Sequence, residues 1–335
     1  MVPGSASGGE IWSATGIIDD KSIWNEDRTM GTSSMKQGPA GPSRRRFVLG
    51  MAASFGVGAA SAGGGIRLWD RLTDPEAAAE ALRRSVLPAS YASSVWFGDS
   101  IRRLVAAGAV DPAKFQYVYM TRGGLPKWVD RLFSESSETP ITFSPETAPY
   151  LLNLLWPLGI ANKTAFNEQS PLNGPSLGSF ASTAGWVLGA KANGAEYFNR
   201  VEAVPLNEAE EATVLEVARN AYRPCCDNST FFQDCNHGSA LLGLLELAAS
   251  QGRNADELYN LAVTANSYWY PKHYLEMALY FEKIEDLSWR DVPAERILSR
   301  KFSSLSGWRS NVHAVLTEAK ILPPPNRGQQ GGCGV

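Results

Sequence analysis

Histidine and cysteine are the scarce residues of this 335-residue sequence, which contains three histidines and four cysteines. An excess of charge of one sign is also missing, because the formal net charge is only −3. A nearly neutral chain gives no electrostatic basis for binding nucleic acid or an anionic membrane surface. We therefore predict that the protein does not bind nucleic acid, and the sequence indicates no other partner.

Long hydrophobic runs are missing as well. The Ala/Gly-rich segment at residues 47–60 is shorter than the roughly 20 apolar residues that a transmembrane helix requires. We expect no stable membrane span, unless this segment is retained as an anchor.

A basic motif precedes that segment, and a small-x-small pattern follows it. Residues 43–49 read Ser-Arg-Arg-Arg-Phe-Val-Leu, and residues 60–62 read Ala-Ser-Ala. The order resembles the twin-arginine (Tat) signal peptide of bacteria and archaea over about residues 35–62. The resemblance implies export of a folded protein to the periplasm or another extracytoplasmic space. Because many passengers of that pathway acquire a metal or organic cofactor before export, it also favours a cofactor.

The signal divides the chain into three expected parts. Residues 1–62 form a disordered extension and signal peptide, residues 63–322 a helical domain, and residues 323–335 a Pro/Gly-rich tail that carries Cys333. Residues 1–34 are unusually acidic for a signal peptide, so a start at Met30 or Met35 is expected.

The central part shows one helical pattern after another and no convincing strand pattern. Capping residues, prolines and apolar periodicity predict these helices. Their expected ranges are 76–84, 93–108, 112 onward, 125–133, 150–158, 207–222, 238–250, 254 onward, 271 onward, 293–300 and 308–320. The fold class is thus a single all-α, multi-helical domain of roughly ten helices.

One long irregular loop is expected at residues 162–198, which are rich in Ser, Asn and Gly. Loops of this length are often functional, although a wandering surface loop is the alternative. Residues 174–178 match the G-x-S-x-G pattern of serine hydrolases. No buried strand precedes Ser176, and few histidines are available as a base, so we do not predict a hydrolase.

The chemical centre is predicted at residues 223–238, a stretch that contains three of the four cysteines. Its pattern is Cys-Cys-x8-Cys-x-His, formed by Cys225, Cys226, Cys235 and His237. Pro224 ends the preceding helix, and Cys235 and His237 begin the next one. The partial positive charge of a helix N-terminus favours the thiolate form of Cys235.

One of the two residues beside Cys235, either Asp234 or Asn236, is expected to cap this helix. Thiolate and imidazole are ligands of soft and borderline metals. The predicted metal site therefore comprises Cys225, Cys226, Cys235 and His237, with Cys333 as a further member. Adjacent cysteines reach one ion poorly, so an iron–sulfur or copper centre with a redox role is preferred over zinc.

Two alternatives to a metal centre stay open. Four cysteines can form two disulfides, for example Cys226–Cys235 with Cys225–Cys333, in an extracytoplasmic binding or scaffold protein. A redox-active thiol pair is the other alternative. Whether the protein is an enzyme is undecided by the sequence; if it is one, a metal-dependent oxidoreductase is expected.

Other candidate groups lie on the predicted helices after the cluster. His273 and Met277 share a helix face and can both point to the centre. Glu246 and Glu276 are candidate proton carriers only if they are buried. Nothing in the sequence around His313 indicates chemistry.

Overall fold

The computed structural model describes residues 75–183 and 185–322 of the chain, and these residues form an all-α fold, as predicted. The twin-arginine motif and Cys333 lie outside the described residues. Residues 81–322 belong to one compact unit, and the first half of helix α3 belongs to a second unit.

The α-helices of the described residues follow one another with short connections. They are α3 Pro75–Val86, α4 Ser100–Ala106, α5 Pro112–Tyr119, α6 Lys127–Leu132, α7 Ala148–Ala161, α8 Leu177–Ala181, α9 Glu208–Asn220, α10 Asn236–Ser250, α11 Ala255–Trp269, α12 Pro271–Ile284, α13 Ala294–Leu298, α14 Arg300–Ser303, α15 Leu305–Trp308 and α16 Ala314–Glu318.

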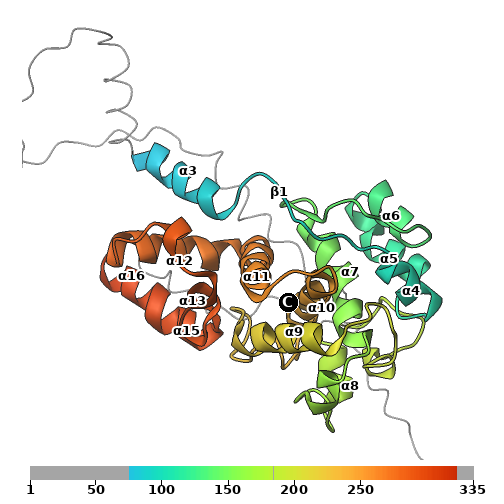
Figure 1. Ribbon diagram of the computed structural model, residues 1–335. Helices are drawn as coiled ribbons and strands as arrows, with labels where there is room; N and C mark the ends of the chain where they lie inside the picture. The colour runs from blue at the N-terminus through green and yellow to red at the C-terminus, as the bar shows by residue number, and fades with distance from the viewer. Residues whose placement is uncertain (1–74, 184, 323–335) are drawn as a thin grey trace, which may run out of the picture. The chain divides into compact units, whose positions relative to one another are not determined.

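Helices α7 and α10 form the centre of the large unit and lie against each other (Figure 1). Both are apolar on nearly every side, which explains why both are buried along almost their whole length. Gly159 and Gly243 face each other where the two backbones approach most closely. The absence of a side chain at these two positions permits that approach.

Local signals placed several helix starts correctly. Asn207 and Asn254 each form a complete capping box, with Glu210 and Glu257 respectively. Proline occupies the first position of α5 and α12, where its missing N–H group costs nothing.

Two expectations about the first third of the chain were wrong or incomplete. The helix expected from residue 93 begins only at Ser100, because the residues before it are extended. There, Tyr91–Ala92 (β1) pairs antiparallel with Thr142–Phe143 (β2), a two-stranded sheet that the sequence pattern did not indicate. Two-residue strands are too short to show alternation.

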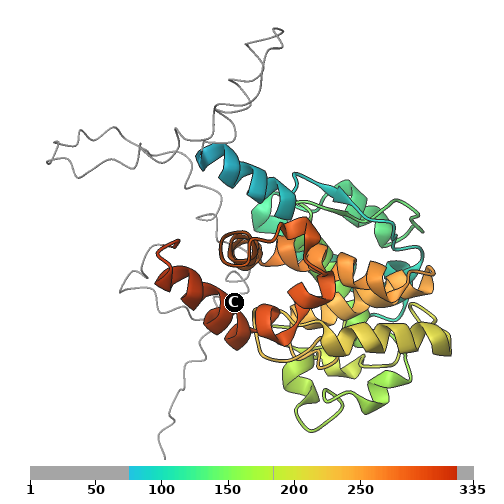
Figure 2. The same ribbon diagram turned by 60° about the vertical axis from the view of Figure 1, so that its left-hand side comes forward.

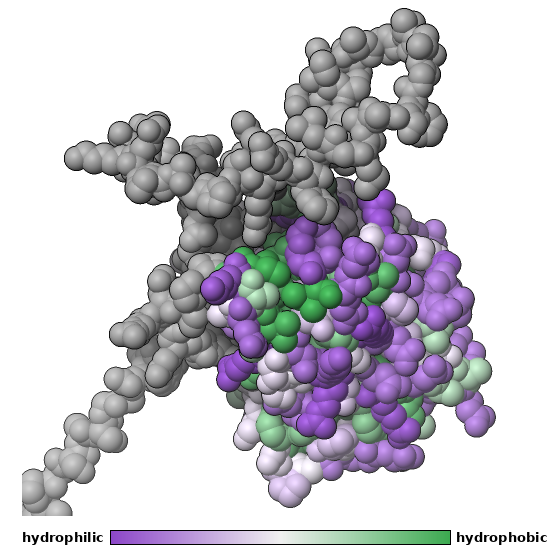
Figure 3. All heavy atoms as spheres, turned by 90° about the vertical axis from the view of Figure 1, so that its left-hand side faces the viewer, coloured by the Kyte–Doolittle hydropathy of each residue, from purple (hydrophilic) through white to green (hydrophobic). Residues whose placement is uncertain are grey.

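The predicted irregular loop at residues 162–198 contains short helical segments, namely Phe166–Gln169, α8 and Gly194–Glu196. The C-terminal helices are more broken than expected, and a π-helical segment, Arg309–His313, joins α15 to α16. Helices α12 to α16 lie beside one another in two views (Figures 1 and 2). On the side of the molecule that carries them, apolar residues gather within a mainly hydrophilic surface (Figure 3).

Among the described residues, no helix combines the length and the apolar character needed to cross a membrane.

Candidate metal centre

The cysteine cluster lies in the loop between α9 and α10, and local hydrogen bonds close that loop on itself. Thr230 donates to the Ala221 carbonyl from both its backbone nitrogen (2.9 Å) and its hydroxyl (2.8 Å). Tyr222 and Ser229 form an isolated antiparallel bridge. Residues 229 and 230 are therefore held against the start of the loop at residues 221 and 222.

The side chain of Arg223 lies inside the loop and is fully buried. Its Nη1 donates to the Asn228 carbonyl (3.1 Å), and its Nη2 to the Phe232 carbonyl (3.1 Å) and to the Asp234 carboxylate. Its Nε donates to the Cys235 sulfur over 3.2 Å. A buried charge needs such compensation, and here the loop supplies two carbonyls, a carboxylate and a thiol.

Sequence reasoning missed both Arg223 and Asp234 as members of the site. A single arginine before Pro-Cys-Cys has no local feature that separates it from a surface arginine. Asp234 was one of the two residues expected to cap α10, the other being Asn236, but its carboxylate instead binds Arg223 and accepts a hydrogen bond from Asn228 (2.7 Å). The cap of α10 is Cys235, whose sulfur accepts from the Gly238 nitrogen at 3.3 Å.

The three cysteines point in two directions. The sulfurs of Cys225 and Cys235 lie 3.5 Å apart, much farther than the roughly 2.05 Å of a disulfide bond. Cys226 turns away toward the carboxylate of Asp234, 3.6 Å from its sulfur. No disulfide joins Cys226 to Cys235 in this structure, so that bond of the disulfide alternative is absent here.

His237 completes one group of possible metal ligands. The ligand atoms of Cys225, Cys235 and His237 all lie within 4.8 Å of one another. A second group, formed by Cys226, Asp234 and Cys235, meets the same limit and shares Cys235 with the first. The structure therefore brings four of the five predicted site residues together, and the fifth, Cys333, lies outside the described residues.

The surroundings set the charge of these ligands. Hydrogen bonds from the Cys225 and Cys226 thiols, together with the positive charge of Arg223, hold the pKa of Cys235 well below its usual range. Hydrogen bonds with Cys226 and Cys235, followed by burial, raise the pKa of Cys225. Burial lowers the pKa of His237 to about 4. One thiolate and one neutral imidazole are thus available at neutral pH, which are the forms that bind metals.

The other histidines lie on a path of aromatic rings that leads away from the cluster. The His273 ring is 4.2 Å from that of Trp308, and Trp308 is 5.1 Å from His313, measured between ring centroids. His313 binds the buried carboxylate of Glu276 through Nδ1 at 2.9 Å. His273 belongs to neither ligand group of the described residues, and Met277 is fully buried in the core.

Glu246 fulfils the condition of burial that its candidate role required. It is 0% exposed on α10, and neither carboxylate oxygen has a hydrogen-bond partner. Burial raises the pKa of Glu246 well above its usual value, so the carboxyl is protonated at neutral pH.

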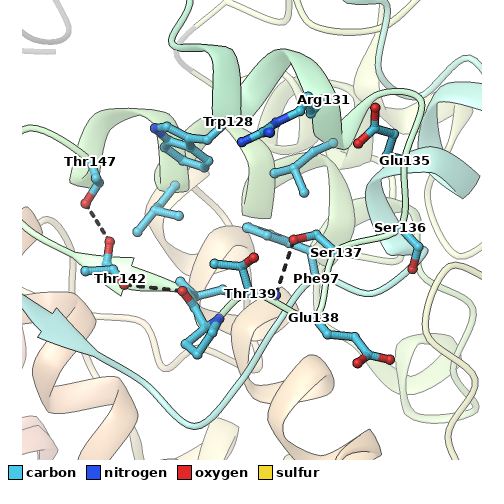
Figure 4. Close-up of a pocket in the computed structure, with 14 residues that line it drawn as sticks. Phe97, Trp128, Arg131, Glu135, Ser136, Ser137, Glu138, Thr139, Thr142 and Thr147 are labelled. Atoms are coloured by element: carbon cyan, nitrogen blue, oxygen red, sulfur yellow. Dashed lines mark hydrogen bonds between the residues drawn. The ribbon is translucent and has the colours of Figure 1, made fainter.

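A separate cavity of about 440 Å³ lies beside the small sheet (Figure 4). Trp128 and Arg131 of α6 lie on one side of it, and Phe97 and Thr139 on the opposite side. No residue of the irregular loop at 162–198 lines this cavity, and it shares no residue with the cysteine cluster. Ser176, the serine of the G-x-S-x-G pattern, is exposed and follows no strand.

Comparisons of the chain with protein-family models, with curated protein sequences and with solved structures found no significant match. The chemistry of this cluster is therefore the feature on which a functional assignment rests.

Proposed function

We propose that this chain is an extracytoplasmic protein that binds a soft metal centre through Cys225, Cys235 and His237. The convergence of their three ligand atoms within 4.8 Å carries the proposal. Two sulfurs and one imidazole nitrogen form a donor set that suits soft or borderline transition metals and not magnesium or calcium.

An iron–sulfur or copper centre with a redox role is the preferred occupant. The adjacent residues Cys225 and Cys226 belong to different ligand groups, and Cys235 is common to both. This divergence supports a centre of more than one metal atom, because each of two neighbouring thiolates can then bind a different atom. In that case Cys226, and Cys333 from the tail, are the further ligands.

Elemental analysis tests the proposal. The full chain is produced in the cytoplasm and purified without air, and iron, copper and zinc are measured per chain together with titratable thiols. We expect stoichiometric metal in the wild type and its loss in Cys225→Ala, Cys235→Ala and His237→Ala. Thr264→Ala, on the exposed part of α11, is the control that keeps its metal.

The remaining cysteines decide between the kinds of centre. Loss of metal in Cys226→Ala indicates a polynuclear centre, and loss in Cys333→Ala alone indicates a single ion with Cys333 as its fourth ligand. Retention in both indicates a single ion with three protein ligands. A metal-free wild type in which all four thiols become paired after export would contradict the proposal. It would support the disulfide-stapled binding or scaffold protein instead.

Export by the twin-arginine pathway is the second part of the proposal, and it rests on the resemblance of residues 35–62. Replacing Arg44 and Arg45 by lysine is expected to retain the protein in the cytoplasm, whereas Lys36→Arg leaves export unchanged. Cell fractionation measures the difference. Equal export of the paired variant and the wild type would contradict this route.

A further inference from the structure

The sulfurs of Cys225 and Cys235 lie in contact with each other. They are 3.5 Å apart, so an approach of about 1.5 Å would bring them to the bond length of a disulfide. Both residues are partly exposed to solvent, which lets a small oxidant reach them. Two of the three proposed metal ligands are therefore also placed to act as a dithiol–disulfide pair.

The environment of Cys235 makes it the attacking thiol of the pair. Its sulfur accepts two hydrogen bonds, from Nε of Arg223 at 3.2 Å and from the Gly238 nitrogen at 3.3 Å. Both donors favour a negatively charged sulfur, because one belongs to a cation and the other lies at the N-terminus of α10. The thiolate is the reactive form of cysteine, so Cys235 is the nucleophile and Cys225 the resolving thiol.

Cys226 is the competing partner, and its surroundings disfavour it. Its sulfur lies 3.6 Å from the Asp234 carboxylate. A thiolate at this position would be repelled by the carboxylate, whereas a protonated thiol can donate a hydrogen bond to it. A disulfide between the adjacent residues Cys225 and Cys226 would close a very small ring and strain the planar peptide bond between them. The geometry therefore favours Cys225 as the partner of Cys235.

We propose that Cys225 and Cys235 form a reversible disulfide, and that this bond and the metal exclude each other, so that oxidation of the pair releases the metal. This inference rests on the proposed metal site and names its regulation. Metal binding requires deprotonated thiolates, and a disulfide sulfur carries no such charge. Oxidation would therefore leave His237 as the one member of its ligand group with an unchanged donor atom.

The oxidant is a low-molecular-weight disulfide of the glutathione disulfide type. The Cys235 thiolate attacks one of its sulfurs, the sulfur–sulfur bond of the oxidant breaks, and one thiolate leaves. Cys225 then gives its proton to that thiolate and attacks the Cys235 sulfur of the mixed disulfide, which expels the second thiolate. The protein pair loses two electrons, and the oxidant is reduced to one thiol and one thiolate.

Glutathione redox buffers test the pair in the metal-free full chain. The protein is equilibrated without air at several ratios of glutathione disulfide to glutathione, quenched with acid and alkylated. Proteolytic cleavage before Asp227 and Asp234 separates Cys235 from Cys225 and Cys226, so that mass spectrometry detects the linked peptides. Fragment ions of these peptides in the wild type assign the partner of Cys235.

Two matched variants make the same assignment independently. Cys226→Ser is expected to form the disulfide at the same glutathione ratio as the wild type, whereas Cys225→Ser should not form it. If a variant does not fold, the fragment ions of the wild type decide alone. A disulfide from Cys235 to Cys226 or Cys333, or no disulfide at any ratio, would overturn the pair.

Zinc tests the mutual exclusion, because it binds thiolates and imidazole without any redox change of its own. With free zinc buffered at about ten times its Kd, the glutathione disulfide ratio at half oxidation should rise about tenfold, since zinc stabilises only the dithiol form. Oxidation should release the bound zinc, and dithiothreitol should restore its binding. A midpoint that zinc leaves unchanged would overturn the exclusion even where the disulfide forms.

The outcomes separate the two proposals. Absence of the disulfide in a chain that binds zinc would overturn this inference and leave the metal site in place. A chain that takes up no zinc and is purified without iron or copper would overturn the metal site, and with it the exclusion. The disulfide is measured in metal-free protein, so its presence or absence does not depend on that result.

Discussion

Arg223 and Cys235 are joined by a hydrogen bond of 3.2 Å from the arginine Nε to the cysteine sulfur, inside a loop that leaves the arginine no contact with solvent. The guanidinium thereby balances a thiolate on one edge and the Asp234 carboxylate on another. Removal of the cation would leave two buried groups that prefer negative charge without compensation. The stability of the loop and the charge of the proposed ligand thus depend on the same residue.

The first prediction follows from this balance. Arg223→Met is expected to reduce the free energy of unfolding by about 3–5 kcal/mol, the range found when one partner of a buried ion pair is removed. Urea denaturation of the metal-free protein measures it. Arg102→Met, which removes a solvent-exposed pair with Asp99, should cost about 1 kcal/mol or less. Similar losses in the two variants would show that the Arg223 side chain does not stabilise the loop.

A second prediction concerns the glycine that faces this arginine. A Cβ atom on Gly238 would lie 2.5 Å from Cζ of Arg223, so Gly238→Ala must displace the guanidinium from Cys235. We expect a loss of about 1–3 kcal/mol in the free energy of unfolding, together with weaker metal binding, measured by competition with a chelator. Gly174→Ala, whose Cβ meets only one backbone oxygen at 3.9 Å, is the control. Unchanged metal affinity in Gly238→Ala would contradict the prediction.

The contact between the central helices supports a third prediction. A Cβ atom on Gly159 of α7 would collide with the Ser239 carbonyl of α10. Because both groups belong to backbones, no side chain can rotate away, and the helices must separate. Gly159→Ala is therefore expected to destabilise the protein by about 3 kcal/mol or more. Thermal and urea denaturation measure the loss, and a change below about 0.5 kcal/mol would exclude the close approach of α7 and α10.

The fourth prediction concerns pH. Burial lowers the pKa of His237 and of His273 to about 4 in the folded chain, whereas an unfolded histidine titrates near 6.5. Between these values the unfolded state binds more protons. The metal-free protein should therefore keep this part of its stability above about pH 6.5 and lose it as the pH falls toward 4.

The slope of that loss is at most about 1.4 kcal/mol per pH unit for each histidine. In His273→Gln, the unfolded state should bind about one proton fewer between pH 4 and 6.5, so the free energy of unfolding should depend less steeply on pH. Urea denaturation at several pH values measures this slope. An identical slope in wild type and His273→Gln would show that His273 is not protected from protonation in the folded state.

The sequence alone was sufficient to predict the all-α class and the start of α9, α10, α11 and α12. Each of these starts depends on a few adjacent residues, such as Asn207 with Glu210, and such short-range interactions are the same in any tertiary context. It was also sufficient to predict that Cys225 and Cys226 lie near Cys235 and His237, because only one short loop separates the two pairs.

The strand pair β1–β2 and the cavity beside it could not be predicted in this way. Their partners lie about fifty residues apart, and two-residue strands show no periodicity. The burial of Glu246 was equally out of reach, because a helix that is apolar on most sides does not indicate which neighbours cover its one acidic residue.

Within the site, the sequence by itself determined the donor types and their short spacing. Only the tertiary structure decided that Cys226 turns toward Asp234, that Arg223 lies inside the loop, and that the ring of Tyr270 packs against His237 from the α11–α12 junction. The physical reason is the distance over which each kind of interaction acts. Capping and spacing act over a single helical turn, whereas the burial of a charge or a hydroxyl depends on all the elements that exclude water from it.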